Sequence, residues 1–564
     1  MYKQVLDPVS NSLGLSSIFA ILPVLVLFLL LGGLRMKAQW ASLISLAVAL
    51  IVATVVYPMP VGQALDSAAE GAVFGLFPIM WIVVNALWIY NMTVRTGHFA
   101  TLRRSFGAIS TDQRIQAVII AFCFGALLEA LAGFGTPVAI CAAMMIALGF
   151  NPVKAAALAL VADTAPVAFG AIAIPITTLS TVTGLPKDDL GAMVGRQTPI
   201  IALILPLVLI FMVDGRRGLR QTWPAGLVAG LVFAVGQFVT SNYISVELTD
   251  IVAALLSAGA LVAFLRVWSP SEPLAAEPQR AQRGAGPAMA GAEAADAAWE
   301  EDVRRRRGGS SGAPAPRGGA LAAFAPYIII IVVLGLANIE PIKGFLAGRT
   351  EMFKWPGLDV VSAKGKPLMS LMFSFNWAAA AGTLLLLSGL LTMLVLRVRP
   401  RDALRVYGET LNQIKWAILT VAAVLALAYV MNQSGQTITL GTWTAGAGGV
   451  FAFLSGLIGW LGVAVTGSDT SSNALFGLVQ TTAAKSTGIS AILLSAANSS
   501  GGVLGKMISP QNLAIGTAAV GMSGREGDLF RRVVGWSVLL VLIMCVIVLL
   551  QNTGLLSWMV VKTK

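Results

Sequence analysis

The sequence contains two apolar stretches interrupted by Gly and Pro that correspond to each other, ALVADTAPVAFGAIAIP (159–175) and LSAANSSGGVLGKMISP (494–510). With an offset of 335 residues they match at four positions, namely Ala162 with Ala497, Asp163 with Asn498, Gly170 with Gly505, and Pro175 with Pro510. The same offset also lays longer apolar runs on each other: 39–57 on 377–398, 115–150 on 442–485, and 195–213 on 534–553. The two stretches therefore indicate an internal repeat that covers most of the chain.

The composition around this repeat is that of a membrane protein. Of 564 residues, 57% are hydrophobic and only 11% are charged, and the mean hydropathy is +0.82. A soluble domain is about a quarter charged, and a disordered chain needs low hydrophobicity, so both classes are excluded. Cys123, Cys141 and Cys545 lie in apolar runs and form neither a disulfide framework nor a metal motif.

Apolar runs long enough to cross a bilayer, which takes roughly 20 residues, recur along the chain. About twelve stretches qualify or come close: 15–34, 39–57, 71–92, 153–182, 195–213, 223–241, 251–268, 324–338, 377–398, 416–432, 489–521 and 534–553. The first run is too long for a cleavable signal peptide. Gly226 and Gly230 form a GxxxG pattern in one run, which indicates close helix packing or arises by chance among 58 glycines.

Lys and Arg gather in alternate connecting segments. The basic segments are 35–38, 93–114, 214–222, 397–415 and 523–533. In 58–70 and 242–250 the only charged residues are acidic, and 433–441 has no charged residue. The positive-inside rule places the basic segments in the cytoplasm and both termini outside. The net charge of +12 then reports topology and not a nucleic-acid partner. The single histidine, His98, lies in a basic segment, where we expect it to be solvated.

Two apolar stretches, 115–150 and 442–485, are too long for one span each. The charge pattern requires the first to enter and leave from the cytoplasm and the second from outside. We predict two re-entrant helical hairpins, which line a wet or protein-filled interior. Two ordinary spans in each stretch would leave the same loop orientation. In either case the repeats run in opposite directions, a common plan of secondary transporters.

The predicted fold is an all-α polytopic membrane protein with about twelve transmembrane helices, two re-entrant hairpins and two inverted-topology repeats with discontinuous helices. The first repeat is 1–213, with hairpin 115–150 and broken helix 153–182. Connecting helices (214–268) and a disordered cytoplasmic linker (269–319), rich in Ala, Gly, Pro, Arg and Glu, follow. The second repeat is 320–564, with hairpin 442–485 and broken helix 489–521. The segment 339–376 has no assignable role.

Four ionisable residues lie inside the apolar segments: Glu129, Asp163, Asp469 and Lys506. A charge at the bilayer centre costs at least about 2.5–3.5 kcal/mol, yet all four fall in the hairpins or the broken helices. This concentration predicts a functional site. The alternative is a buried structural pair, for example Lys506 with an acidic residue.

Small polar residues surround these charges and suit a small polar anion. Lys506 offers a charge partner for a carboxylate, and nearby hydroxyls and amides can bond further oxygens. The expected substrate-binding residues are Lys506, Gly133, Gly135, Thr136, Thr164, Ser471, Ser472, Asn473, Asn498, Ser499 and Ser500. Glu129, Asp163 and Asp469 are candidates to carry a proton, because a carboxyl removed from water binds one more readily. No cofactor or metal site is expected, although broken-helix carbonyls with Asp469 leave sodium coupling open.

Four motifs resemble the bacterial lactate permease family: FCFGALLEALAGFGTPVAI (122–140), DTAPVAFGAIAIP (163–175), GWLGVAVTGSDTSSNALF (459–476) and AANSSGGVLGKMISPQNLAI (496–515). The resemblance extends along almost the whole chain. It implies proton-coupled import of L-lactate, D-lactate and glycolate across the bacterial cytoplasmic membrane. It also implies the scaffold of the wider ion-transporter superfamily, in which two hairpins and two broken helices move substrate by an elevator-like shift.

Two features depart from the family pattern. The linker 269–319 is longer and richer in Ala and Arg than expected, and Asp163 stands where the family pattern leads us to expect Asn. An extra acid opposite an anion site either alters coupling or pairs with Lys506. We expect a transporter and not an enzyme, because the chain has no zincin motif and its only His lies in a loop. A homo-oligomer is left open.

Overall fold

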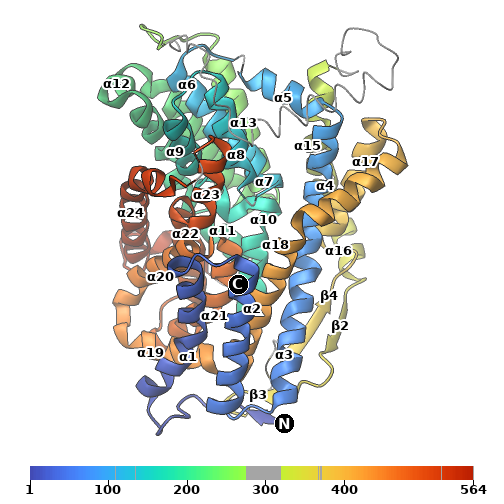
Figure 1. Cartoon of the computed structure of the whole chain (residues 1–564), viewed down its shortest axis with the longest axis vertical. Coiled ribbons are helices and arrows are strands. Elements are labelled where there is room, and N and C mark those ends of the chain that lie inside the picture. The colour runs from blue at the N-terminus through green and yellow to red at the C-terminus, as the bar shows by residue number, and fades with distance from the viewer. Residues whose placement is uncertain are drawn as a thin grey trace.

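The computed structural model describes residues 1–107, 109–133, 135–274, 319–365, 368, 371–522 and 524–562, and these are mostly helical (Figure 1). In this part of the chain, eight helices are long and apolar enough to cross a membrane, or ten if each of two bent helix pairs is one span. The protein is therefore an all-α polytopic membrane protein. The N-terminus lies at the end of the molecule opposite to α5 and α6, whose segment is predicted to be cytoplasmic (Figure 1).

The helices of the first half follow one another through short turns. In chain order the elements are β1 (Tyr2–Lys3), α1 (Leu13–Phe28), α2 (Ala38–Ile51), α3 (Val61–Phe74), α4 (Trp81–Arg95), α5 (His98–Gly107), α6 (Gln113–Ala117), α7 (Gly125–Leu131), α8 (Thr136–Ala147), α9 (Pro152–Ala162), η5 (Val167–Phe169), α10 (Gly170–Thr183), α11 (Lys187–Val194), α12 (Thr198–Tyr243) and α13 (Thr249–Phe264). Short π-helical segments extend or join several of them: η1 (Leu29–Gly33), η2 (Val52–Val56), η3 (Gly75–Met80) and η4 (Val118–Phe124).

The second half adds short strands to its helices. In chain order the elements are α15 (Gly319–Ala337), α16 (Glu340–Ala347), β2 (Glu351–Lys354), β3 (Val360–Val361), β4 (Met372–Phe375), α17 (Ala381–Val395), α18 (Pro400–Ser434), α19 (Gln436–Thr444), η7 (Ala445–Val450), α20 (Phe451–Thr466), α21 (Asp469–Thr487), α22 (Ala491–Gly502), η8 (Val503–Ile508), α23 (Pro510–Ala519), α24 (Glu526–Gln551) and η9 (Ser557–Met559). β2 pairs antiparallel with β4, and β1 pairs parallel with β3. β2, β3 and β4 lie in 339–376, the segment to which the sequence assigned no role, and β1 lies near the N-terminus.

The predicted count of about twelve spans is not confirmed. Two of the eight long helices, Gln113–Leu131 and Gln436–Thr466, overlap the predicted hairpins, and the predicted span 489–521 is divided into α22, η8 and α23. The helices at 251–268 and 377–398, α13 and α17, are apolar but have only 16 and 15 residues. The predicted spans 195–213 and 223–241 belong to one helical run, α12, whose backbone is non-helical at Asp214 and Gly215. Because helices packed in protein need not match the bilayer thickness, length alone miscounts them.

The two halves of α12 fold back on each other. A Cβ atom added to Gly230 would lie 2.3 Å from the Leu203 carbonyl oxygen, and one on Gly226 would lie 2.7 Å from Ile210 Cδ1. The Leu203 backbone leaves no room for a side chain at Gly230, whereas a side chain at Gly226 would have to displace the ends of Ile210 and Leu207. The GxxxG pattern is therefore a close helix contact, as one of the two sequence interpretations proposed.

The stretches 115–150 and 442–485 each contain two helices joined by a glycine turn. In the first, the continuous helix α6–η4–α7 meets α8 after Gly133 and Gly135, whose φ angles are +52° and +78°. In the second, α20 meets α21 at Gly467, with φ +75°. α7 packs against α8 and α20 against α21. Both stretches are helical hairpins, and their re-entrant nature stays a prediction.

The two predicted broken helices are interrupted at their centres. α9 ends at Ala162, and the following helix is bent by 63° relative to it. Ala171, Ile172 and Ala173 then have positive φ angles of 44°, 59° and 56°, a left-handed turn that costs residues with a Cβ roughly 1–2 kcal/mol each. In the second broken helix, α22 passes into the 3₁₀ turn η8 before α23 begins.

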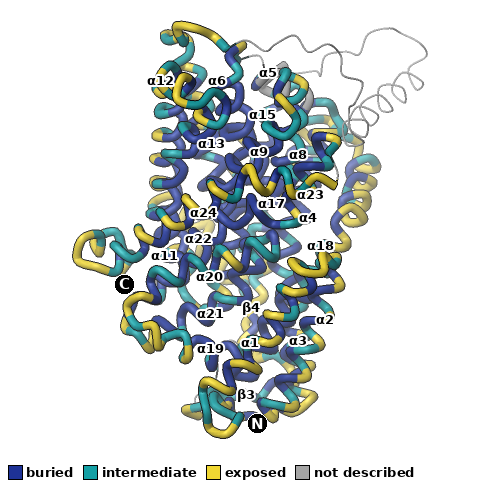
Figure 2. Tube along the Cα trace, turned by 60° about the vertical axis from the view of Figure 1, so that its left-hand side comes forward, coloured by how far each residue is buried: buried dark blue, intermediate teal, exposed yellow. Residues whose placement is uncertain are grey.

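Each hairpin packs against parts of both broken helices. α10 contacts α7 and α21, α22 contacts α20 and α21, and α23 contacts α8. Figure 2 shows buried residues throughout this central region, including α9 and α22. The breaks therefore lie where both hairpin turns can reach them.

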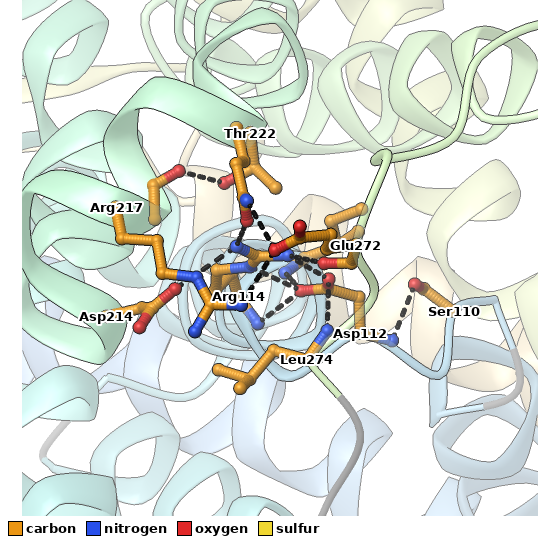
Figure 3. Close-up of polar contacts among 11 residues, drawn as sticks. Ser110, Asp112, Arg114, Asp214, Arg217, Thr222, Glu272 and Leu274 are labelled. Carbon is orange, nitrogen blue, oxygen red and sulfur yellow. Dashed lines mark hydrogen bonds and ion pairs between the residues drawn. The ribbon is translucent and has the colours of Figure 1, made fainter.

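A buried arginine cluster closes the predicted cytoplasmic end (Figure 3). Arg114 donates two hydrogen bonds to Asp112, at 3.1 and 2.6 Å, and one each to Asp214 (3.1 Å), Gln221 (2.6 Å) and the Glu272 carbonyl (2.7 Å). We call these five residues the Arg114 cluster. Arg114 belongs to the basic segment 93–114 but is fully buried, because the start of α6, the turn in α12 and the segment after α13 enclose it.

The segment after α13 is ordered where it meets this cluster. The Leu274 amide donates to Asp112 at 2.9 Å, its carbonyl accepts from Gln113 at 2.9 Å, and Arg217 pairs with the Glu272 carboxylate at 2.8 Å. Residues 269–274 therefore do not fit the predicted disordered linker. Residues 275–318 of that linker lie outside the described residues, and Gly319 begins α15.

His98 is not solvated as predicted. It begins α5 with 6% of its surface exposed, and its Nδ1 lies 2.8 Å from Thr96 Oγ1. Burial lowers the pKa of His98. The packing of α5 against α4 and α15 covers the imidazole, which a charge count of the loop does not reveal.

Candidate functional site

Three of the four predicted intramembrane charges meet at the breaks of the two broken helices. Lys506 lies in η8, Asp163 ends α9, and Glu129 lies on α7 in the first hairpin. Lys506 Nζ is 2.6 Å from Glu129 Oε1 and 3.0 Å from Asp163 Oδ2. All three side chains are buried. We call this group the Lys506 centre.

Local sequence explains this close approach. The chain leaves the α-helix after Gly502 and turns as a 3₁₀ helix, which carries Lys506 at the break. A Cβ on Gly170 would lie 2.9 Å from Glu129 Oε1. Gly170 therefore leaves room for the Glu129 carboxylate at the start of α10.

The Lys506 centre has more negative than positive groups. Two carboxylates face one ammonium, and neither Glu129 Oε2 nor Asp163 Oδ1 has a hydrogen-bond donor among the described residues. An uncompensated charge removed from water is costly, and two carboxylates that share a site do not readily ionise together. The geometry therefore suits a centre that holds one proton beside the Lys506 ion pair.

The fourth charge, Asp469, forms a second group beside the first. It begins α21 at the turn of the second hairpin, and its Oδ2 accepts from Ser499 Oγ at 2.5 Å and Asn473 Nδ2 at 3.3 Å. Its Oδ1 has no donor in the described part of the chain. A Cβ on Gly502 would lie 2.5 Å from this oxygen. Asp469 is within electrostatic reach of Lys506 but makes no ion pair with it.

A ladder of amides ties the second hairpin to both broken helices. Asn473 Oδ1 accepts from Asn498 Nδ2 at 2.9 Å, and Asn498 Oδ1 accepts from Gln480 Nε2 at 3.1 Å. Asn473 Nδ2 also donates to the Pro175 carbonyl at 3.2 Å. Asn473, Asn498 and Ser499 thus lie together with Asp469, as a shared site requires.

The remaining predicted substrate-binding residues are engaged elsewhere or only line the turns. Thr164 and Ser472 donate to backbone carbonyls, of Val161 and Gly459 respectively, and Ser500 donates to Gln197 at 2.7 Å. Ser471 is buried in the first turn of α21, and its amide is capped by the Ser468 hydroxyl. Gly133, Gly135 and Thr136 form the turn of the first hairpin.

Asn512, near the start of α23, lies between the two hairpin turns and is absent from the predicted set. Its Nδ2 donates to Ser509 Oγ at 2.8 Å, to the Lys506 carbonyl at 3.3 Å and to the Gly467 carbonyl at 3.4 Å. A Cβ on Gly135 would lie 3.3 Å from Asn512 Oδ1. Asn512 lies close to Lys506 in the sequence, in the motif GKMISPQN (505–512), and this proximity could have indicated that it belongs to the site.

Two buried carboxyl groups were also missed. Glu70 is 1% exposed and accepts from Gln433 at 2.6 Å, and Asp250 is fully buried and accepts from Gln237 at 2.9 Å. Both were placed in extracellular loops, but α3 and α13 begin before them. Among the described residues, no three His, Cys, Asp or Glu side chains gather in a way that could hold a metal ion.

A family model and individual relatives of known name agree on the family to which the chain is similar. Residues 16–554 match the family model described as L-lactate permease. The chain is 42% identical to the L-lactate permease of Bacillus subtilis (strain 168), over 99% of this chain and 100% of the relative. It is 42% identical to glycolate permease GlcA of Escherichia coli (strain K12), over 97% of this chain and 98% of the relative. The solved YdaH transporter of Alcanivorax borkumensis is 14% identical over 86% of each chain, with a TM-score of 0.43, too low to support a conclusion.

Proposed function

This chain belongs to the L-lactate permease family, and from that premise we propose that it imports L-lactate, D-lactate or glycolate together with protons. It is a multi-pass protein of the bacterial cytoplasmic membrane. The observation that carries the proposal is the Lys506 centre, where one buried ammonium faces two carboxylates. A binding site for a small anion needs such a cation, and proton coupling needs such acids.

The centre links anion binding to proton binding by charge balance. A substrate carboxylate that reaches Lys506 Nζ takes the place of Glu129 or Asp163. The displaced side chain then has no cation partner, and in a site removed from water it takes up a proton. One anion and one proton therefore enter together, and the net charge of the centre does not change.

Asp469 and its partners would recognise the second polar group of the substrate. A 2-hydroxymonocarboxylate carries a hydroxyl next to its carboxylate, and that hydroxyl can both donate and accept a hydrogen bond. Asp469 Oδ1 is an acceptor without a donor among the described residues, while Ser499 and Asn473 hold the other carboxylate oxygen in place. A monocarboxylate without the hydroxyl would leave this oxygen unpaired and bind less well.

The broken helices and hairpins suit alternating access. In a secondary transporter the binding site lies at discontinuous helices near the bilayer midplane, and one part of the protein moves against the other. Substrate and proton would shift the population between outward-facing and inward-facing states. An elevator-like movement, which the family resemblance implies, would carry the site with the hairpins.

Uptake of radiolabelled lactate into proteoliposomes tests the proposal. With one proton per anion, an imposed gradient of one pH unit should support about tenfold accumulation. A sodium gradient at constant pH should support none. Accumulation driven by sodium alone would instead favour a sodium-coupled carboxylate symporter that holds the ion at Asp469. Chromatography of the label inside the vesicles should show unchanged lactate, whereas an enzyme would have converted it. A passive channel would fail to accumulate lactate against its gradient.

A further inference from the structure

Asp250 is a buried acid that the proposed mechanism does not yet use. It lies in the first turn of α13 and is fully buried. Its Oδ1 accepts one hydrogen bond, from Gln237 Nε2 at 2.9 Å, and its Oδ2 has no donor among the described residues. Among the described residues, no Lys or Arg forms an ion pair with Asp250, in contrast to the pairs of Lys187 with Glu247 and Lys506 with Glu129. An ionised carboxylate in this position would be uncompensated.

Gln237 joins this acid to the break of the first broken helix. The same Nε2 that donates to Asp250 also donates to the Ala165 carbonyl at 3.3 Å. Gln237 Oε1 accepts from Thr198 Oγ1 at 3.2 Å, which fixes the orientation of the amide. Ala165 lies two residues after Asp163 of the Lys506 centre. The Asp250–Gln237 pair therefore touches the backbone that positions Asp163.

The elements packed on α13 bring few titratable groups near Asp250. α7 packs on α13 and carries Glu129, whose negative charge acts on Asp250. η4 presents Cys123, whose Sγ contacts Ser257 Oγ further along α13, and the charges of α12 lie at its distant turn. Glu247, just before α13, is bound to Lys187 and Ser245. Of these groups, Glu129 belongs to the Lys506 centre and links Asp250 electrostatically to it.

Asp250 also lies on the side from which an imported proton arrives. The segment 242–250 is predicted to face outside, and Tyr243 and Ile244 are 74% and 55% exposed. Asp250 is only a few residues further along the chain, beyond the buried residues Ser245, Val246 and Leu248, and is linked through Gln237 to the Ala165 carbonyl at the break. With this segment facing outside, we expect a proton from outside to reach Asp250 before the Lys506 centre.

We propose that Asp250 is a second proton-binding residue of the transport cycle, positioned by Gln237 to exchange its proton with the Lys506 centre. Asp250 carries a proton on its carboxyl in the conformation described here. When it gives up that proton, the new negative charge draws the Gln237 amide closer, which weakens the bond from that amide to the Ala165 carbonyl. Proton occupancy at Asp250 thereby affects the break next to Asp163. This inference rests on the proposed proton-coupled import.

The test separates proton-driven accumulation from exchange. Asp250→Asn keeps the shape and the hydrogen bond but cannot ionise. We expect it to lower accumulation under one pH unit from about tenfold to near equality, whereas counterflow of lactate between preloaded vesicles and medium persists. Asp250→Glu should restore part of the accumulation. Glu70→Gln is the matched control, since Glu70 is a buried carboxyl with one glutamine donor that joins α3 to α18, and it should accumulate lactate normally.

Further results of these uptake measurements would contradict either the proposed function or the role of Asp250. If wild-type protein accumulates nothing under a pH gradient, the proposed function fails, whatever the variants do. If wild type and Asp250→Asn accumulate alike, or if Asp250→Asn loses counterflow as well while its thermal unfolding stays normal, Asp250 does not carry the coupled proton. Should Asp250→Asn not fold, Gln237→Met replaces it. Without the donor, Asp250 holds its proton more tightly, so the uptake profile should move to higher pH, and an unchanged profile overturns the proposal.

Discussion

The Arg114 cluster and the Lys506 centre each place one buried cation between two carboxylates, yet they differ in how completely their polar atoms are bonded. Arg114 donates five hydrogen bonds, the full capacity of a guanidinium (Figure 3). In the Lys506 centre, Glu129 and Asp163 each keep an oxygen without a donor among the described residues. A saturated cluster holds three segments in one arrangement, whereas an unsaturated one can accept a ligand or a proton.

The unsaturated cluster should govern transport, and Lys506→Ala should have the largest effect of any single change. Loss of one partner of a buried ion pair costs about 3–5 kcal/mol, and 1.4 kcal/mol corresponds to a factor of ten. We expect lactate uptake into proteoliposomes to fall by about a hundredfold or more. Lys485→Ala is the control, because Lys485 is exposed on α21 and should transport normally. Normal uptake by Lys506→Ala would refute the anion-binding role.

The saturated cluster should govern folding. Arg114→Ala leaves the buried Asp112 carboxylate without a cation, together with the partly exposed Asp214, and should lower the free energy of unfolding by about 3–5 kcal/mol. Arg114→Lys should not rescue it, because an ammonium cannot reproduce the forked geometry. Thermal unfolding in detergent measures the effect, and the protein that remains folded should still show pH-driven uptake. A stable Arg114→Ala protein with lost coupling would reverse the assignment of the two clusters.

Within the Lys506 centre, Asp163→Asn should change the pH dependence and not abolish transport. Without the second carboxylate, Lys506 stabilises the charged form of Glu129 more strongly. Glu129 then takes up its proton only at lower pH, so the uptake profile should shift down by about one pH unit. Glu129→Gln in parallel identifies the proton carrier. An unchanged profile in Asp163→Asn, with lost accumulation in Glu129→Gln, would leave Asp163 a structural partner of Lys506.

The rim of the Arg114 cluster should contribute least. Arg217 and the Glu272 carboxylate form an exposed ion pair, with side chains 62% and 63% exposed. Such pairs are screened by salt and contribute little. Glu272→Ala should therefore leave the unfolding temperature nearly unchanged, and the small difference should vanish in high salt. A large loss of stability would mean that this carboxylate, and not the Glu272 carbonyl, holds the segment.

The pH response should also separate the two clusters. Burial alone would raise the pKa of Asp112, but hydrogen bonds from the Arg114 side chain and the Leu274 amide outweigh it and hold that pKa below its usual range. A lowered pKa contributes stability that is present above the unfolded value of about 3.9 and is lost only in more acid solution. The contribution of Asp112 to the stability of the wild-type protein, followed by unfolding at a series of pH values, should thus stay constant from neutral pH down to about pH 5.

The sequence identifies the residues of the charged centre because charges inside apolar runs stand out, whereas their roles in binding and coupling stay predictions. Lys506, Glu129 and Asp163 were named from their position alone, and the structure brings them into contact. Glu70 and Asp250 were missed for the converse reason. Both lie near the ends of apolar runs, where a hydropathy pattern assigns polar residues to loops. α3 begins at Val61, ten residues before the predicted span, so Glu70 is inside the helix.

Contacts between segments that are distant in the chain could not be predicted from the sequence patterns. Arg114 is buried only because the α12 turn and the segment after α13 cover it, and neither is adjacent in the chain. The β2–β4 pair is likewise too short to produce an alternating pattern. Short helices such as α17 fall below the length expected of a span, although surrounding helices support them.

The position of Asn512 bears on leakage. A pathway open at both ends would let protons cross without substrate and would dissipate the gradient that drives accumulation. The Asn512 side chain donates to the Gly467 carbonyl in the turn of the second hairpin, and a Cβ on Gly135 in the turn of the first would lie 3.3 Å from its Oδ1. In the proposed alternating-access cycle, a residue placed against both turns would couple their movements, oppose opening on both faces at once and so limit the leak of protons.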